Sequence, residues 1–416
     1  MSLLTDVHDR IEQAREAPGC SSELHWTSFA EFFRSRLYDP RLVTRNFLTY
    51  CDDDRNLRRT YSYAEFGTIV ERMAEMFHTK FGLTRGDRIA TVLFNHDLTA
   101  LIYFAAWTLG VAVVPINVEE TPEKKRYILE HSEASVALCW QDVYEELKAL
   151  QSMLPALREV VALGDGGILD GKETRGKSRK NSHAVGARFA LGTSRLDDPA
   201  LIIYTSGTTG PPKGVILTVA NLLIDADAIA DRHGFGLTDR VMCVLPVHHV
   251  NGIVVTLMTP FYCKGSVVLN RKFKTGSFWR RLHDEQVTSV SVVPTLLEFL
   301  LDADEDLAAY RLDRFGGVIC GAGPLLKDTA LRFEERFGFP IRHGYGLSET
   351  TCYSCFLPND LTGEEHRHWL TDFDFPSIGT TLRHNEMAIL DESGKAVAEQ
   401  ARAEIGKVCV DACLRI

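Results

Sequence analysis

The stretch that decides the fold of this 416-residue chain is Tyr204-Thr-Ser-Gly-Thr-Thr-Gly-Pro-Pro-Lys-Gly-Val215. It directly follows the apolar run Ala200–Tyr204, so a buried strand leads into a loop rich in glycine and hydroxyl side chains. Such a loop can surround a polyphosphate with backbone N–H groups and hydroxyls, and Lys213 adds a positive charge. It is not a Walker loop, because Pro212 and Gly214 flank that lysine instead of glycine and Ser or Thr. We therefore predict a phosphate-binding loop, against the alternative of a flexible surface turn.

Strand-like and helix-like segments alternate on both sides of this loop. Arg88–Phe94 is a compact run rich in β-branched residues, a helical pattern follows it, and Val111–Pro115 is strand-like again. Parallel strands joined by helices give this alternation, and the helices then cover both faces of the sheet. The sequence therefore predicts an α/β fold with two βαβ-type subdomains, each a mostly parallel sheet between helices. Further strands are expected at Ser135–Trp140, Ala200–Tyr204, Val241–Leu245, Ser266–Leu269, Ser289–Val293 and Gly317–Cys320, and a helix at Asn221–Ala230.

Changes of composition mark the expected domain boundaries. Residues 164–195 combine glycines, serines and a basic cluster, which is typical of a solvated loop between subdomains. We therefore place the first α/β subdomain at residues 1–190 and the second, with the phosphate loop, at residues 191–350. Two short strand patterns around a turn then predict a small antiparallel β subdomain at residues 351–416.

The overall composition narrows the function classes. The formal net charge is −10, so the chain lacks the basic excess of a general nucleic-acid binder. Ten cysteines without regular spacing, and an N-terminus without an apolar signal core, indicate a reduced cytoplasmic protein. Leu98–Ile116 is long and apolar, but Gly110 divides it. This favours a buried helix followed by a buried strand over a membrane span.

The loop at Tyr204–Val215 closely resembles the phosphate loop of the adenylate-forming superfamily. That superfamily comprises acyl- and aryl-CoA synthetases, firefly luciferase and the adenylation domains of peptide synthetases. Thr60–Phe66 and Arg85–Ile89 resemble earlier landmarks of these enzymes, and Glu404–Val410 resembles a late one. The resemblance is closest to acyl- or aryl-CoA ligases. It implies that this chain is their large N-terminal part without the small C-terminal lid domain, and that by itself it adenylates slowly or not at all.

The resemblance gives the phosphate loop its role. It implies that the loop holds the phosphates of ATP, that Lys213 reaches them, and that Thr205 also lies close to the metal ion. The residues implied in phosphate binding are Thr205, Ser206, Gly207, Thr208, Thr209, Gly210 and Lys213.

Two later motifs match the adenine side of the superfamily's site. In the first motif, Gly321–Pro324, glycines let a flat base approach the backbone, although the same residues could form a simple turn. In the second motif, Tyr345–Thr350, the ring of Tyr345 offers a base a stacking surface worth about 1–3 kcal/mol. Glu349 offers the oxygen ligand that Mg²⁺ prefers, although it could equally be a surface acid. The residues implied here are Gly321, Ala322, Gly323, Pro324, Gly344, Tyr345, Gly346, Ser348 and Glu349.

Pro246–Gly252 resembles the superfamily's acid-binding motif. The resemblance implies that His249 lies beside the substrate carboxylate and gates the acyl pocket. Taken alone, this histidine would as readily be a buried residue with satisfied hydrogen bonds. The residues implied in catalysis are Thr205, Lys213, His249 and Glu349.

Together the motifs imply ATP-dependent activation of a carboxylic acid to acyl-AMP with release of pyrophosphate, and Mg²⁺ as a cofactor. The acyl group would then pass to the thiol of CoA. One alternative acceptor is the pantetheine of an acyl carrier protein in secondary metabolism, and another function is that of a catalytically silent nucleotide-binding homologue. Four cysteines also leave open a zinc site, against which their spacing argues: Cys352, Cys355, Cys409 and Cys413.

Overall fold

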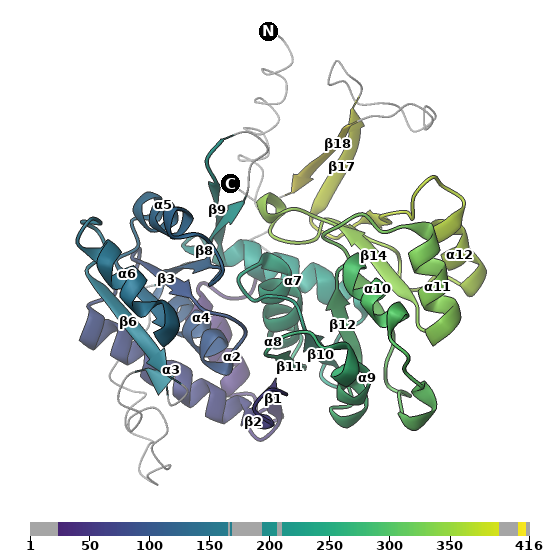
Figure 1. The fold of residues 1–416 in the computed structure, drawn as a ribbon, viewed down its shortest axis with the longest axis horizontal. Helices are drawn as coiled ribbons and strands as arrows, with labels where there is room; N and C mark the ends of the chain where they lie inside the picture. The colour runs from purple at the N-terminus through teal and green to yellow at the C-terminus, as the bar shows by residue number, and fades with distance from the viewer. Residues whose placement is uncertain (1–23, 165–166, 169–193, 206–209, 391–406, 413–416) are drawn as a thin grey trace.

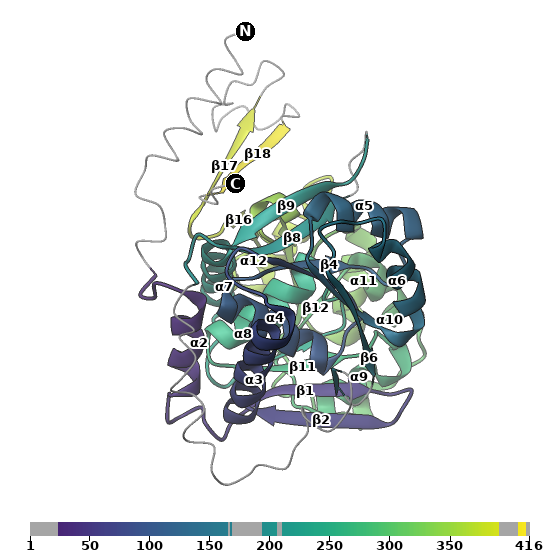
Figure 2. The ribbon, with the colours of Figure 1, turned by 90° about the vertical axis from the view of Figure 1, so that its left-hand side faces the viewer.

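The computed structural model describes residues 24–164, 167–168, 194–205, 210–390 and 407–412. The chain forms two large sheets, which lie side by side with helices packed on them (Figure 1). A two-stranded hairpin, β17 (Asn385–Leu390) with β18 (Lys407–Ala412), projects from one end of this body (Figure 2). These observations confirm the predicted α/β class with two mostly parallel sheets flanked by helices.

The first sheet has seven strands in the order β7-β6-β5-β3-β4-β8-β9. Its centre is parallel, and β7 and β9 pair antiparallel at its two edges. β8 and β9 form a hairpin connected by the phosphate loop, and Thr205 pairs with Lys213 where the hairpin opens. The strands are β3 Arg88–Val92, β4 Ala112–Ile116, β5 Val136–Trp140, β6 Glu159–Gly164, β7 Gly167–Ile168, β8 Pro199–Thr205 and β9 Lys213–Thr218.

The second sheet has nine strands in the order β16-β15-β14-β13-β12-β10-β11-β1-β2. From β14 to β1 the strands are parallel, while β2, β15 and β16 pair antiparallel at the two edges. The strands are β1 Asn46–Asp52, β2 Leu57–Ser62, β10 Arg240–Cys243, β11 Ser266–Asn270, β12 Ser289–Val292, β13 Val318–Cys320, β14 Ile341–Tyr345, β15 Cys355–Phe356 and β16 Thr380–Thr381.

The sheets do not divide the chain at the subdomain boundaries predicted near residues 190 and 350. Residues 46–62 pair into the second sheet, because β1 runs parallel to β11. The strands on either side of the phosphate loop belong to the first sheet, because β8 pairs with β4. Division into folding units at residues 190 and 350 stays a prediction.

Helices begin and end where their sequences satisfy the terminal backbone groups. In α7, the Thr218 side chain accepts from the Asn221 amide and the Asn221 side chain accepts in return, while Gly234 ends the helix at φ 66°. The helices are α2 Phe29–Leu37, α3 Tyr63–Phe81, α4 Asp97–Leu109, α5 Pro122–Ser132, α6 Tyr144–Gln151, α7 Val219–His233, α8 Thr259–Tyr262, α9 Thr275–Asp284, α10 Pro294–Asp302, α11 Lys327–Phe337 and α12 Gly363–Thr371, with short helical turns η2 Gln141–Val143, η5 Leu307–Ala309 and η6 Ser348–Thr350 and a π-helical segment η4 Asn251–Met258.

The apolar stretch at residues 98–116 is a buried helix and a buried strand, as predicted. Every residue of α4 and of β4 is buried, and the indole of Trp107 donates to the Ala200 carbonyl at 2.8 Å. Packing between the first sheet and α2 and α3 therefore explains the hydrophobicity of this segment. Across the described ranges, no helix has both the length and the apolar character that a bilayer crossing requires.

Candidate functional site

The candidate motifs follow the carboxyl ends of β8, β10, β13 and β14. Ligands of open α/β sheets bind outside the carboxyl ends of the strands, so the placement fits a binding site. Four residues of the phosphate loop, Ser206, Gly207, Thr208 and Thr209, lie outside the described residues. Thr205, half-buried at the end of β8, and Gly210, exposed at φ 117°, mark where the loop leaves and rejoins the sheet.

The candidate phosphate-binding cation and the candidate metal ligand lie on elements that contact each other, β9 and η6. Lys213, the first residue of β9, is exposed, and so is Glu349 in η6. Within the described part of the chain, neither side chain makes a hydrogen bond or an ion pair, with the other or with a third residue. An ammonium and a carboxylate without partners are the groups that a magnesium nucleotide requires, so these residues fit ATP and Mg²⁺.

Tyr345 ends β14 with a ring that is only half-buried. Its backbone is fixed, because its carbonyl accepts from the Ser354 amide at 2.8 Å. Among the described rings, none stacks on Tyr345, whereas Tyr353 packs on Phe356 with centroids 4.1 Å apart. Tyr345 therefore keeps a face on which a nucleobase can stack, and Tyr353 does not.

Three of the motifs meet at Tyr353, a residue that the sequence analysis did not single out. Its buried hydroxyl accepts from the amide of Asn251 at 3.1 Å, and the Asn251 carbonyl oxygen accepts from Ser291 at 2.7 Å. A Cβ added to Gly321 would overlap the Tyr353 ring and would lie 2.9 Å from the Gly344 carbonyl. The glycine at position 321 therefore makes room for Tyr353, where the sequence suggested room for adenine. An aromatic residue only three positions after the Tyr345–Thr350 motif was the signal that the sequence offered for Tyr353.

Two residues of the candidate site hold left-handed backbone conformations although they carry side chains. Ala322 has φ 60° in the loop after β13, and Thr351 has φ 71° directly after η6. Ala322 is exposed and Thr351 is buried, with a hydroxyl that has no partner among the described groups. Such conformations cost about 1–3 kcal/mol each and concentrate at ligand sites. The strain thus supports a binding role for the two loops that also contain Gly323, exposed Pro324, half-buried Gly346 and half-buried Ser348.

His249 is exposed on the loop after β10, next to the π-helical segment η4. Insertions of this helical form are frequent at functional sites. The protein around the ring lowers the pKa of His249 by partial desolvation, which Glu120 opposes and Lys124 reinforces. His249 is therefore neutral at neutral pH and can accept or donate a hydrogen bond without carrying charge. No hydrogen bond or ion pair joins it to Lys213 or Glu349 in the described chain.

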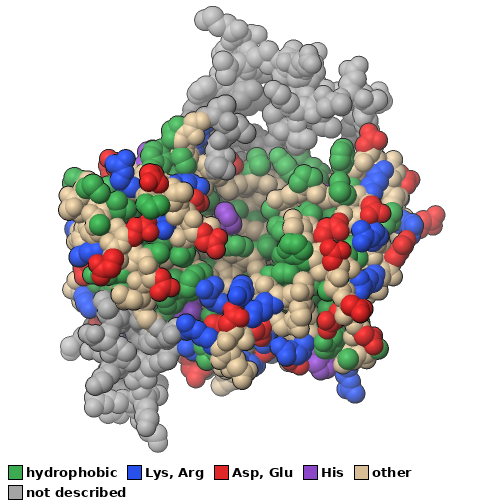
Figure 3. Space-filling model, in the orientation of Figure 1, with side chains coloured by type: hydrophobic (Ala, Val, Ile, Leu, Met, Phe, Trp, Pro, Cys, Tyr) green, Lys and Arg blue, Asp and Glu red, His purple; other side chains and the backbone are tan. Residues whose placement is uncertain are grey.

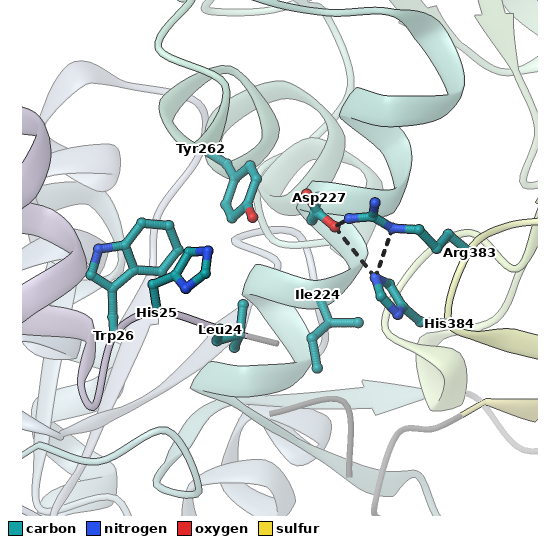
Figure 4. Close-up of a pocket in the computed structure, with 8 residues that line it drawn as sticks. All are labelled: Leu24, His25, Trp26, Ile224, Asp227, Tyr262, Arg383 and His384. Atoms are coloured by element: carbon teal, nitrogen blue, oxygen red, sulfur yellow. Dashed lines mark hydrogen bonds and ion pairs between the residues drawn. The ribbon is translucent and has the colours of Figure 1, made fainter. Parts of the chain in front are cut away.

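The face shown in Figure 3 carries a shallow hollow between the parts of the molecule built on the two sheets. Hydrophobic side chains gather beside it, and charged side chains of both signs lie around its margin (Figure 3). A separate cavity of about 170 Å³ lies between the start of the described chain, α7, α8 and the loop before β17 (Figure 4). There Asp227 pairs with Arg383 and lies 3.3 Å from His384. None of the candidate residues lines this second cavity, which is a junction between α7 and the β17–β18 hairpin.

The alternative zinc site receives no support from the side chains that the structure describes. No group of three or more His, Cys, Asp or Glu residues in them could hold a metal ion. Cys352 and Cys355 are both buried, and burial raises the pKa of the Cys355 thiol to about 11. A protonated thiol is a poor zinc ligand. Cys413 lies outside the described residues.

Asp225, in the middle of α7, is a buried acid that lies next to Tyr353 of the candidate site. One of its carboxyl oxygens has no partner among the described groups, and the Tyr353 amide donates to the carboxyl group. Burial raises its pKa well above the ordinary value, more than that hydrogen bond lowers it. The folded protein therefore holds this carboxyl in its neutral form at neutral pH.

Replacing Asp225 by asparagine is expected to flatten the pH dependence of stability. In the unfolded chain this carboxyl ionises above its ordinary pKa of about 3.9, whereas in the folded chain it keeps its proton. The free energy of unfolding thus falls by up to about 1.4 kcal/mol per pH unit above that value, until the raised pKa is reached. Urea unfolding between about pH 5 and 8 measures this slope, with exposed Asp231→Asn as the control on the same helix. Equal slopes in wild type and Asp225→Asn would contradict a neutral buried acid.

Comparison with known proteins gives a family and a fold. A protein family described as AMP-binding enzyme matches residues 44–413. The sulfoacetate–CoA ligase of Cupriavidus necator is 33% identical over 283 residues, which cover 67% of this chain and 53% of that protein. A crotonobetaine/carnitine–CoA ligase of Escherichia coli is 26% identical over 366 residues, which cover 86% of this chain and 66% of that protein. The chain thus spans from about half to two thirds of the length of these relatives.

A solved structure supports the same fold. The ATP-bound MatB of Rhodopseudomonas palustris matches with a TM-score of 0.76 at 22% identity, over 93% of this chain and 70% of that chain. At this identity the likeness concerns the fold.

Proposed function

Because this chain belongs to the AMP-binding enzyme family, we propose that it takes part in ATP-dependent activation of a carboxylic acid and its transfer to the thiol of CoA. One observation carries the proposal. Lys213 on β9 and Glu349 on η6 are both exposed and without partners among the described residues, and their two elements are in contact. In the proposal, Lys213 is the phosphate-binding cation and Glu349 the metal-binding carboxylate, both beside the loop between β8 and β9. The CoA ligase relatives make CoA the expected acceptor.

The proposed first step joins two anions. A carboxylate oxygen of the acid attacks the α-phosphorus of ATP, the bond from that phosphorus to the bridging oxygen breaks, and pyrophosphate leaves with the electron pair. Lys213 would bind the phosphates and reduce the repulsion between the reactants. Tyr345 would hold the adenine by stacking, which fixes the position of the α-phosphorus. Mg²⁺ bound by Glu349, with Thr205 near, would supply further neutralisation of the phosphate charge.

The second step replaces the phosphate ester by a thioester. The sulfur of CoA attacks the carbonyl carbon of the acyl-AMP, the bond from that carbon to the phosphate oxygen breaks, and AMP leaves. The thiol proton is released to solvent or to a base. His249 would line the acid side of the site as a neutral imidazole, which can hydrogen-bond the acyl oxygen without binding it as an ion pair.

The relatives suggest which carboxylic acids to test first as substrates. Sulfoacetate and crotonobetaine or carnitine, named for the two CoA ligases above, are short acids that carry a second charged group. The Lys124–Glu120 ion pair, at 2.8 Å, provides charges of both signs close enough to His249 to influence its pKa. We therefore place short, polar carboxylic acids first among the candidate substrates.

Incorporation of labelled pyrophosphate into ATP tests the proposal with a panel of such acids. The assay compares this chain with a form that carries the C-terminal domain implied by the resemblance. Acid-dependent exchange is expected in the longer form, and Lys213→Met should remove most of it, whereas Lys148→Met on exposed α6 should not. Discharge of the product by CoA, and not by a carrier protein, is the expected second result. ATP binding without exchange for any acid would instead favour a catalytically silent homologue.

A further inference from the structure

A second polar pocket lies at the amino ends of the parallel strands of the nine-stranded sheet. It has a volume of about 200 Å³ and is lined by Arg45, Asn46, Thr238, Arg240, Ser266 and Arg314. Asn46, Arg240 and Ser266 are the first residues of β1, β10 and β11. Arg240 pairs in register with Ser266, so the strands themselves bring these side chains together. The candidate motifs follow the opposite, carboxyl ends of β10, β13 and β14 in the same sheet.

The three arginines are held in place by backbone carbonyls and neighbouring strands. Arg45 donates to the Leu237 carbonyl at 3.0 Å, and Arg314 donates to the next carbonyl, that of Thr238, at 2.6 Å. Both guanidinium groups are therefore anchored to one loop. Each of these two arginines has five N–H donors and uses one of them in its hydrogen bond to the loop. The other donors are available to a ligand.

Arg240 lines the pocket and also holds a buried donor without a hydrogen-bond partner among the described groups. One terminal nitrogen donates to Thr49 at 2.8 Å and to Glu285 at 2.7 Å. Its Nε is buried and has no hydrogen-bond partner among the described groups. Burial lowers the pKa of this guanidinium, against the opposing effect of Glu285, so its positive charge is poorly solvated. A buried donor without a partner costs about 1–3 kcal/mol.

The local charge balance is positive in a chain that is acidic overall. Two carboxylates lie close to Arg240: Glu285 pairs with it at 2.7 Å, and Asp239 is the residue before it. Glu285 also pairs with Arg58, and Asp239 accepts from the Gly236 amide at 2.8 Å. Arg342, for which Asp239 is a coulombic partner, adds a further cation nearby. The lining of the pocket thus holds three arginines and no acidic residue, although the formal charge of the chain is −10.

We propose that this pocket binds a phosphoryl anion, either free phosphate or the terminal phosphate of a small metabolite. Guanidinium groups match the oxygens of a phosphate in paired hydrogen bonds, and several of them around one anion favour a dianion over a single carboxylate. The Asn46 amide and the Ser266 hydroxyl supply neutral donors beside them. The volume accommodates a phosphate group with part of a substituent. This site is distinct from the nucleotide site and does not rest on the proposed ligase activity.

Isothermal titration calorimetry on the 416-residue chain at constant ionic strength tests the inference. Inorganic phosphate and phenyl phosphate are titrated separately, so that free anion and phosphomonoester are distinguished. The double variant Arg45→Gln, Arg314→Gln is expected to weaken binding at least ten-fold, because it removes two of the three cations. Arg367→Gln, an exposed arginine on α12, is the matched control and should leave binding unchanged. Arg240 is left intact, since its removal would leave Glu285 poorly compensated.

The outcomes separate clearly. Weakened binding in the double variant, with normal binding in the Arg367→Gln control, supports a phosphoryl site at this pocket. Equal binding in wild type and double variant overturns the proposal, as does failure of wild type to bind either probe. If the double glutamine variant unfolds, the double variant Arg45→Lys, Arg314→Lys is measured instead, because lysine keeps the positive charge. Each single glutamine variant then gives the affinity lost at its position, and the double lysine variant must retain more than half of that affinity.

Discussion

Replacing Glu349 by glutamine is expected to lower acid-dependent pyrophosphate exchange at least about 100-fold in the form that carries the C-terminal domain. Glutamine keeps the size of the side chain but removes the negative charge that Mg²⁺ requires of an oxygen ligand. Glu349 is exposed, and its side chain makes no hydrogen bond or ion pair with the described residues, so the folded chain should be unaffected. The measurement is exchange as a function of Mg²⁺ concentration, together with thermal unfolding of the variant.

A matched control separates metal binding from a general effect of charge. Glu335→Gln removes an exposed carboxylate on α11, whose partner Arg367 lies 3.8 Å away, and should leave exchange within about two-fold of wild type. A shift of the Mg²⁺ dependence to higher concentration in Glu349→Gln would support a role in metal binding. Unchanged exchange at all Mg²⁺ concentrations would show that the motif has been assigned wrongly.

Replacing Gly346 by alanine is expected to destabilise the chain by at least about 3 kcal/mol and to abolish exchange. The added Cβ would overlap the carbonyl oxygen of Cys352 and would lie 2.6 Å from the Cα of Tyr353. These are backbone atoms of the turn that follows η6, so no side chain can rotate away. Either the turn opens and moves Glu349 away from β9, or the folded state loses the stated free energy. Denaturant unfolding and exchange assays measure the two effects.

Gly276→Ala is the control for this substitution. Gly276 lies in α9, where an added Cβ meets no atom within 4 Å, so alanine should raise stability by about 0.5–1 kcal/mol. Normal stability of Gly346→Ala would mean that the backbone between Gly346 and Tyr353 adapts easily. It would then contradict the rigid placement of Glu349 on which the proposed site depends.

Much of the fold could be predicted from the sequence, because buried parallel strands read as short β-branched runs. The helix and strand at residues 97–116 were found in this way although they resemble a membrane span. The sheet to which a strand belongs could not be read in the same way. β1 and β8 look alike as local patterns, and only contacts with residues far along the chain place them in different sheets.

The candidate site was predictable where a motif carries unusual chemistry, and not where a buried residue supports it. Lys213, Tyr345 and Glu349 all stand on the loops expected to hold a nucleotide, although their roles stay a prediction. Tyr353 and Asp225 escaped notice, because their importance comes from burial and from partners that the linear pattern does not reveal.

The pairing of β1 with β11 has a consequence for folding during synthesis on the ribosome. β2 follows β1 closely and can pair with one of its edges, but Leu48 lies opposite Val267, so roughly 220 residues must be added before β1 meets its parallel neighbour β11. At about 5–20 residues per second this takes about 10–45 s. During that interval β1 has only β2 beside it, and its buried side chains on both faces, such as Phe47 and Leu48, lack the rest of the sheet and its covering helices. A nascent chain of this design depends on α3 and α4, or on a chaperone, to shield its earliest strand from aggregation.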